Sequence, residues 1–181
     1  YLKLPIKVYK KKEFDLIKIK GGKIIKPFNY KIPTDISSCA FFIVLTALSK
    51  NSQIKIKNVN INPSRSGIIK ILNMMGVKIN LKNIKIYKGE KIADIHVKSV
   101  RSIKPIKCPP KLNSSAIDEF LVIFLVAAKA NGTSLFTNLS ELNQKESPRL
   151  KWGHKILKEM GVKTTITNNS IKIVGNPNLK I

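Results

Sequence analysis

"KILNMMGVKI" (70–79) and "KILKEMGVKT" (155–164) are two versions of the same stretch of sequence. In each one, apolar residues recur at helical spacing up to a glycine, and strand-forming residues follow. Further upstream, "KNSQIKIKNV" (50–59) and "ANGTSLFTNL" (130–139) form a second matching pair. The chain therefore repeats itself with a period of about 80 to 85 residues, and each repeat predicts one structural unit.

The predicted elements follow the same order in both repeats. The first repeat predicts helices over 36–50 and 62–77, and strands over 53–59, 77–83 and 92–100. The second predicts helices over 115–132 and 145–162, and strands over 133–139, 163–168 and 170–175. A leading strand is expected before each first helix, over 23–33 and 106–109. This alternation predicts an α/β (α+β) fold of two βαβαββ units, at about 32–103 and 104–176, with Asp35 as the first N-cap.

The composition is that of a folded protein without a membrane span. Its 181 residues, 43% of them hydrophobic, are enough to bury one or two cores. No run of about 18 apolar residues occurs, so no membrane helix is expected. Cys39 and Cys108 lack the spacing of a zinc site or a disulfide framework, which favours a reducing, cytoplasmic compartment. The first residues contain neither an initiator Met nor a signal-peptide core, and we interpret the chain as a fragment of a longer protein.

The charge is strongly positive, with 34 Lys and Arg against 10 Asp and Glu and a formal net charge of +24. Such a charge favours a basic module that binds nucleic acid. However, lysines are spread among many Ile and Asn residues, as AT-rich coding sequences produce, and aromatic residues do not interleave with them as base-stacking platforms would. We therefore interpret the lysines as a solvated surface, with no nucleic-acid partner expected. The arginines, Arg65, Arg101 and Arg149, are the more informative cations.

The stretch "QKESPRLKWGHKIL" (144–157) poses an electrostatic question. On a helix, Lys145 and Arg149 are four positions apart, so they share a face and repel each other. A helix start is also the positive end of the helix dipole, which disfavours cations. Glu146 lies between the two.

Four motifs together resemble those of the 5-enolpyruvylshikimate-3-phosphate synthases, a family of enolpyruvyl transferases. They are "IPTDISSCAFF" (32–42), "NPSRSGIIKILNMMGV" (62–77), "SAIDEF" (115–120) and the Lys-Glu-Ser/Thr-x-Arg signature in "KESPRL" (145–150). The resemblance runs from about residue 20 to about residue 175. It implies an inside-out α/β barrel fold, in which two domains each contain three βαβαββ units. Residues 1–31 then correspond to the last strands of the first domain or an interdomain segment, and 32–181 to two of the three units of the second domain.

The resemblance also implies a reaction and the residues that carry it. The family transfers the enolpyruvyl group of phosphoenolpyruvate to the 5-hydroxyl of shikimate 3-phosphate and releases phosphate, without a metal or organic cofactor. Asp118 corresponds to the residue that contacts the substrate hydroxyls and accepts a proton, and Lys145 to the lysine that binds shikimate 3-phosphate. Glu146 corresponds to the glutamate proposed for proton transfer at phosphoenolpyruvate, and Arg149 to the arginine that clamps this substrate. Two cations at a helix start then become favourable when an anion docks between them.

Simpler interpretations of these residues also exist. Without the resemblance, Asp118 is more typical of an ordinary acid in the first turn of a helix, where the dipole favours it, and the resemblance reverses this interpretation. We expect Arg65, at the equivalent helix start in the first repeat, to be structural, and we assign no role to Glu119. Asn143 and Pro148 depart from the family's pattern, which puts the catalytic rate in question rather than the fold.

Several expectations concern the protein as a whole. The resemblance implies a monomer when the protein is full length and an inactive fragment when this chain is alone. The alternatives are a related enolpyruvyl transferase, such as the one that acts on UDP-N-acetylglucosamine, a nucleic-acid-binding module on the same scaffold, and a non-catalytic structural domain.

Overall fold

The computed structural model describes residues 4–22, 24 and 26–180, and the chain divides into two compact units, Tyr1–Ile32 and Pro33–Ile181. The smaller unit contains a hairpin of β1 (Ile6–Lys10) and β2 (Asp15–Ile19), paired antiparallel along its whole length. Residues 23 and 25 of the strand predicted over 23–33 lie outside the described residues. The described remainder of that stretch forms no strand, so this prediction is wrong there. The assignment of 1–31 to another domain stays a prediction.

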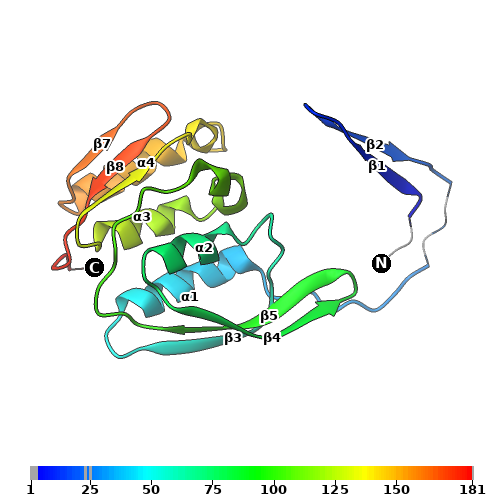
Figure 1. The fold of residues 1–181 in the computed structure, drawn as a ribbon, viewed down its shortest axis with the longest axis horizontal. Helices are drawn as coiled ribbons and strands as arrows, with labels where there is room; N and C mark the ends of the chain where they lie inside the picture. The colour runs from blue at the N-terminus through cyan, green and yellow to red at the C-terminus, as the bar shows by residue number, and fades with distance from the viewer. Residues whose placement is uncertain (1–3, 23, 25, 181) are drawn as a thin grey trace. The chain divides into compact units, whose positions relative to one another are not determined.

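The first repeat folds in the predicted order. Its elements are α1 (Ile36–Leu48), β3 (Gln53–Asn60), α2 (Gly67–Met74), β4 (Ile79–Tyr87) and β5 (Glu90–Lys98). The sheet has the order β3-β5-β4 with both pairings antiparallel, and α1 and α2 cover one of its faces (Figure 1). Asp35 caps α1 as predicted, since its carboxylate accepts from the backbone N–H of Ser38 at 2.9 Å. Burial alone would raise the pKa of Asp35, but the hydrogen bonds from Ser38 hold it below its ordinary value of 3.8.

The second repeat builds the same layers. It contains the short 3-10 helices η1 (Pro110–Leu112), η2 (Ser114–Ala116) and η3 (Ser140–Asn143), the helices α3 (Phe120–Ala128) and α4 (Arg149–Glu159), and the strands β6 (Thr133–Phe136), β7 (Thr164–Ile166) and β8 (Ile171–Val174). Its sheet has the order β6-β8-β7, again with the last strand in the middle. The helices and later strands of both predicted βαβαββ units are thus present. Isolated parallel bridges join Thr34, just after the first predicted leading strand, to Val59, and Lys107, within the second, to Leu135.

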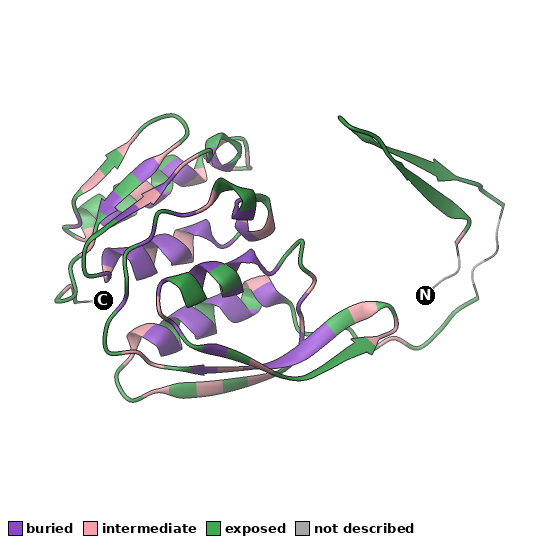
Figure 2. Ribbon diagram, in the orientation of Figure 1, coloured by how far each residue is buried: buried purple, intermediate pink, exposed green. Residues whose placement is uncertain are grey.

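One core joins the two repeats within the larger unit. α1 contacts α3, and α3 consists of apolar residues on all sides, as a helix buried in a protein interior does. The rings of Phe120, Phe124 and Phe136 pack together with centroids 5.2 to 6.0 Å apart. Figure 2 shows buried residues along α1, α2 and α3. Because the repeats share this core, loops from both can contribute to one site.

Three helices begin later than their apolar pattern predicts. The helix predicted from residue 62 begins at Gly67, the one from 115 at Phe120, and the one from 145 at Arg149. In the first case the Asn62 side chain accepts from the N–H of Ser64, a local turn that competes with a helix. In the third, Pro148 disfavours helical backbone at the residue before it. The polar residues in front of α2 and α4 therefore lie in loops, and those in front of α3 lie in η2 and the turn that follows it.

No helix among the described residues is long and apolar enough to cross a bilayer. The thiols of Cys39 and Cys108 are free and buried.

Candidate active site

Asp118 lies at the centre of the residues that the sequence singled out. It sits in the turn between η2 and α3, and its carboxylate is about one-third exposed. Arg149, the first residue of α4, donates from Nη1 to Asp118 Oδ1 at 2.9 Å. Lys145 Nζ lies 3.7 Å from the same oxygen. The structure therefore brings Asp118, Lys145 and Arg149 together.

Glu146 is attached to this group through Arg149. Its Oε2 accepts from Arg149 Nη2 at 3.3 Å, and its side chain is 86% exposed. The guanidinium of Arg149 thus lies between two carboxylates, and Glu146 is at the solvent edge of the cluster. All four predicted site residues belong to one connected set of contacts.

Two details of the sequence interpretation need correction. Lys145 and Glu146 precede α4 rather than lying on it, so Lys145 and Arg149 do not share a helix face. Their mutual repulsion is offset by a shared anion, the carboxylate of Asp118. Asp118 is also no first-turn acid, because α3 begins at Phe120 and has no acid in its first turn. Its carboxylate instead contacts cationic side chains from other segments of the chain.

Arg65, which the sequence predicted to be structural, also contacts this cluster. Its Nη2 lies 3.6 Å from Asp118 Oδ2 and donates to Ser37 Oγ at 3.1 Å. Arg65 precedes α2 and Arg149 starts α4, so residues at the starts of the corresponding helices of the two repeats converge on one carboxylate. The signal in the sequence was this correspondence, together with the scarcity of arginine.

Glu119 also has a partner that the sequence did not suggest. Its carboxylate is buried and accepts a hydrogen bond from Ser37, in the first turn of α1. Burial raises the pKa of Glu119; the Ser37 hydrogen bond opposes this rise, and the neighbouring charge of Asp118 adds to it. Ser37 thus connects the buried Glu119 with the half-exposed Arg65.

The charges of the cluster suit an anionic ligand. Three cations, Arg65, Lys145 and Arg149, face the carboxylate of Asp118, and the exposed Glu146 adds a second carboxylate, so positive charge is in excess. A guanidinium is suited to bidentate recognition of phosphate or carboxylate. A carboxylate beside such cations can accept a proton from a bound hydroxyl. The arrangement can therefore bind a phosphorylated hydroxyl compound and take part in proton transfer. Among the described residues, no group of three His, Cys, Asp or Glu side chains could hold a metal.

The positions that depart from the family's pattern have local roles. Asn143 Nδ2 donates to the carbonyl of Asn168 at 3.3 Å, which ties η3 to the turn between β7 and β8. Pro148 is the residue before α4 and provides no side-chain cap. Arg149 obtains its carboxylate partners from Asp118 and Glu146 instead.

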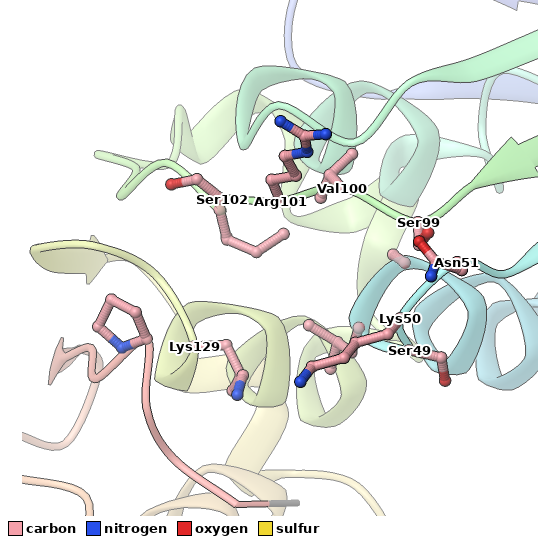
Figure 3. A pocket seen from close by; sticks show the side chains of 12 residues that line it. Ser49, Lys50, Asn51, Ser99, Val100, Arg101, Ser102 and Lys129 are labelled. Atoms are coloured by element: carbon pink, nitrogen blue, oxygen red, sulfur yellow. The ribbon is translucent and has the colours of Figure 1, made fainter.

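A separate cavity of about 490 Å³ lies at the C-terminal ends of α1 and α3, whereas the Asp118 cluster lies near their N-terminal ends (Figure 3). Lys50 and Lys129 approach it from the C-terminal ends of these helices, and Arg101 lies on the segment after β5. None of the cluster around Asp118 lines it. The cations at these C-terminal ends complement the helix dipoles, so they need no ligand to be favourable.

Comparison with known proteins agrees with this geometry. The family model described as EPSP synthase (3-phosphoshikimate 1-carboxyvinyltransferase) matches residues 2–180. The chain belongs to the EPSP synthase family. The family predicted from the four motifs is thereby confirmed.

The curated relatives are 3-phosphoshikimate 1-carboxyvinyltransferases whose chains are much longer than this one. The chain is 40% identical to the 3-phosphoshikimate 1-carboxyvinyltransferase of Ruthia magnifica subsp. Calyptogena magnifica, over 86% of this chain and 35% of the relative. It is 41% identical to that of Thermoanaerobacter pseudethanolicus, over 90% of this chain and 37% of the relative. The chain thus spans a little over a third of the length of the curated relatives it matches.

Solved structures confirm the predicted fold. EPSP synthase from Acinetobacter baumannii superposes with a TM-score of 0.86 at 38% identity, covering 96% of this chain and 38% of that one. The enolpyruvyl transferase NikO from Streptomyces tendae has a TM-score of 0.64 at 13% identity, again over 96% of this chain and 38% of the other, which indicates a shared fold. The family model and the curated names favour EPSP synthase over other enolpyruvyl transferases.

Proposed function

We propose that the complete polypeptide carrying this chain transfers the enolpyruvyl group of phosphoenolpyruvate to the 5-hydroxyl of shikimate 3-phosphate and releases phosphate. The observation that supports this most directly is the convergence of Arg149, Lys145 and Arg65 on the carboxylate of Asp118. Family membership and the names of the relatives agree with it.

The chemistry requires a base, an acid and cations. The 5-hydroxyl oxygen bonds to C2 of phosphoenolpyruvate while C3 gains a proton, and a tetrahedral intermediate results. Loss of a C3 proton and cleavage of the C2–O bond to phosphate then give the product. Acid and base groups in hydrogen-bond reach of the reacting atoms accelerate such steps.

We assign these roles within the cluster. Asp118 accepts the hydroxyl proton, and Lys145 binds shikimate 3-phosphate and orients that hydroxyl. Arg149 binds phosphoenolpyruvate, since its forked guanidinium suits a carboxylate or phosphate. Glu146, held by Arg149 and exposed to solvent, transfers the proton at C3. The assignment uses no metal and no organic cofactor.

Further proposals concern the whole protein. We propose that it acts as a monomer, in the cytoplasm, and without a nucleic-acid or membrane partner. The free thiols of Cys39 and Cys108 support a reducing compartment. Because this chain spans a little over a third of its relatives, we expect it to be inactive when expressed alone.

The decisive experiment measures phosphate release by the complete polypeptide, given phosphoenolpyruvate and shikimate 3-phosphate. Release that requires both substrates and is lost in Asp118→Asn is the expected result. Lys151→Ala, an exposed cation on α4, serves as the control that keeps turnover. A folded wild-type protein that releases no phosphate would contradict the proposal. Wild-type turnover in Asp118→Asn would contradict the assignment of the base.

A further inference from the structure

The two oxygens of Asp118 face different cations. Oδ1 lies 2.9 Å from Arg149 Nη1 and 3.7 Å from Lys145 Nζ. Oδ2 lies 3.6 Å from Arg65 Nη2, on a segment of the other repeat. A carboxylate bound at one oxygen can still rotate about its Cβ–Cγ bond, whereas cations on both oxygens oppose that rotation. Arg65 is the cation on the second oxygen.

Arg65 is itself held through a hydrogen-bond chain of defined direction. The single O–H of Ser37 donates to Glu119 Oε1, and its oxygen accepts from Arg65 Nη2 at 3.1 Å. Glu119 is 3% exposed, so its carboxylate has little access to water as an alternative partner. We call this the Arg65–Ser37–Glu119 chain. Because the Ser37 hydroxyl directs its hydrogen at Glu119, the lone pairs of the Ser37 oxygen remain available to the Arg65 guanidinium.

The backbone around Arg65 is also held in place. The backbone N–H of Arg65 donates to the Asn62 carbonyl at 2.9 Å, and the Asn62 side chain accepts from Ser64. Gly67, two residues on, packs directly against Ser115, just before Asp118 in the chain. The segment that carries Arg65 is therefore fixed beside the segment that carries Asp118.

We propose that Arg65 is a positioning residue for Asp118, held at the site by the Arg65–Ser37–Glu119 chain. This inference rests on the proposed function, in which Asp118 accepts the proton of the substrate hydroxyl. Arg65 acts through Asp118: it keeps the carboxylate in one orientation while substrate engages Lys145 and Arg149. Loss of Arg65 frees the rotation of the base without removing a group assigned to substrate binding.

The test uses the complete polypeptide with phosphoenolpyruvate and shikimate 3-phosphate. Arg65→Ala is expected to lower kcat by about tenfold or more while KM for each substrate changes by less than about threefold. Arg65→Lys, which keeps a cation without the fork, is expected to recover part of the lost kcat. Arg101→Ala is the matched control, since Arg101 is exposed and lies by the separate cavity. It is expected to keep the wild-type kcat.

The role of Ser37 is tested by a double variant. Ser37→Ala is expected to lower kcat less than Arg65→Ala does, and to add no further loss in the Arg65→Ala background. Losses that multiply independently would overturn the assignment of Ser37. If Arg65→Ala fails to fold, Arg65→Gln replaces it in the same comparison.

Two outcomes would overturn the proposal and are separable from failure of the proposed function. A folded Arg65→Ala or Arg65→Gln protein with wild-type kcat would show that Asp118 needs no such support. If the wild type releases no phosphate, the proposed function fails, and crystal structures of wild type and Arg65→Ala decide the positioning. The expected result is a changed Asp118 side-chain rotamer in Arg65→Ala, and an unchanged rotamer would overturn the inference.

Discussion

Arg149 and Asp118, 31 residues apart in the chain, are joined by a hydrogen bond of 2.9 Å between Nη1 and Oδ1. The other terminal nitrogen of Arg149 donates to Glu146 at 3.3 Å. One guanidinium thereby links the start of α4 to the turn before α3, and both of its terminal nitrogens donate hydrogen bonds. A lysine cannot reproduce this geometry, because its charge is a single point.

Arg149→Lys is expected to lower kcat/KM for phosphoenolpyruvate by about tenfold to a hundredfold, since hydrogen bonds to charged groups contribute roughly 1.5 to 3 kcal/mol. Steady-state kinetics of the complete polypeptide measure this effect. Lys151→Arg, an exposed change on the same helix, is the control and should leave kcat/KM unaltered. A fully active Arg149→Lys enzyme would show that the fork is not required.

Glu119 is expected to make the folded state less stable as the pH rises. Burial raises the pKa of Glu119 in the folded state above the ordinary 4.5, which applies to the unfolded state. At pH values between the unfolded pKa and the folded pKa, the folded state therefore binds more protons than the unfolded state. The free energy of unfolding contributed by this group therefore falls as pH increases from about 4.5 through the folded pKa.

Urea unfolding of wild type and Glu119→Gln at a series of pH values isolates this contribution. The difference in stability, variant minus wild type, should grow with pH above about 4.5 and then level off. A difference that stays constant, or that shrinks with rising pH, would show that the pKa of Glu119 is not raised.

Gly67 is expected to tolerate no side chain. A Cβ at this position would lie 2.8 Å from the carbonyl carbon of Ser115, which is backbone and cannot rotate away. Gly67→Ala should therefore lower the free energy of unfolding by about 1 to 3 kcal/mol, as overpacking does. Urea titration measures the change. A Cβ at Gly21 would have nothing within 4 Å, so Gly21→Ala provides the control, and equal behaviour of the two variants would contradict the prediction.

Cys39 and Cys108 are expected to be unreactive in the folded protein. Burial raises the pKa of each thiol to about 11, and the charge of Asp35 adds to the rise at Cys39. Since the thiolate is the reactive form, an aromatic disulfide reagent should label neither residue at neutral pH and both in urea. Rapid labelling without denaturant would show that at least one thiol is accessible and ionised.

Local patterns predicted most of the secondary structure. The apolar stretch from Ile36 predicts a helix that ends within two residues of the observed α1, and the alternating stretch from Gln53 predicts β3. Helix starts were placed too early where the chain contains Asn62 or Pro148, because side-chain turns and proline restrict the backbone more strongly than apolar spacing shows. The predicted leading strands are wrong: the structure has an isolated bridge at Lys107 within 106–109 and none in the described part of 23–33.

The sequence by itself determined the repeat and the family, and it singled out Asp118, Lys145, Glu146 and Arg149 as candidate site residues, because these depend on local spacing and on motifs a few residues long. The tertiary structure alone decided which charges meet. Ser37 and Glu119 are 82 residues apart, and Arg65 belongs to a different repeat from Asp118. Their contacts exist because α1 and α3 share one apolar core, which brings the loops at their N-terminal ends together. Apolar periodicity specifies which side of each helix is buried, but not which polar side chains become neighbours once the helices pack.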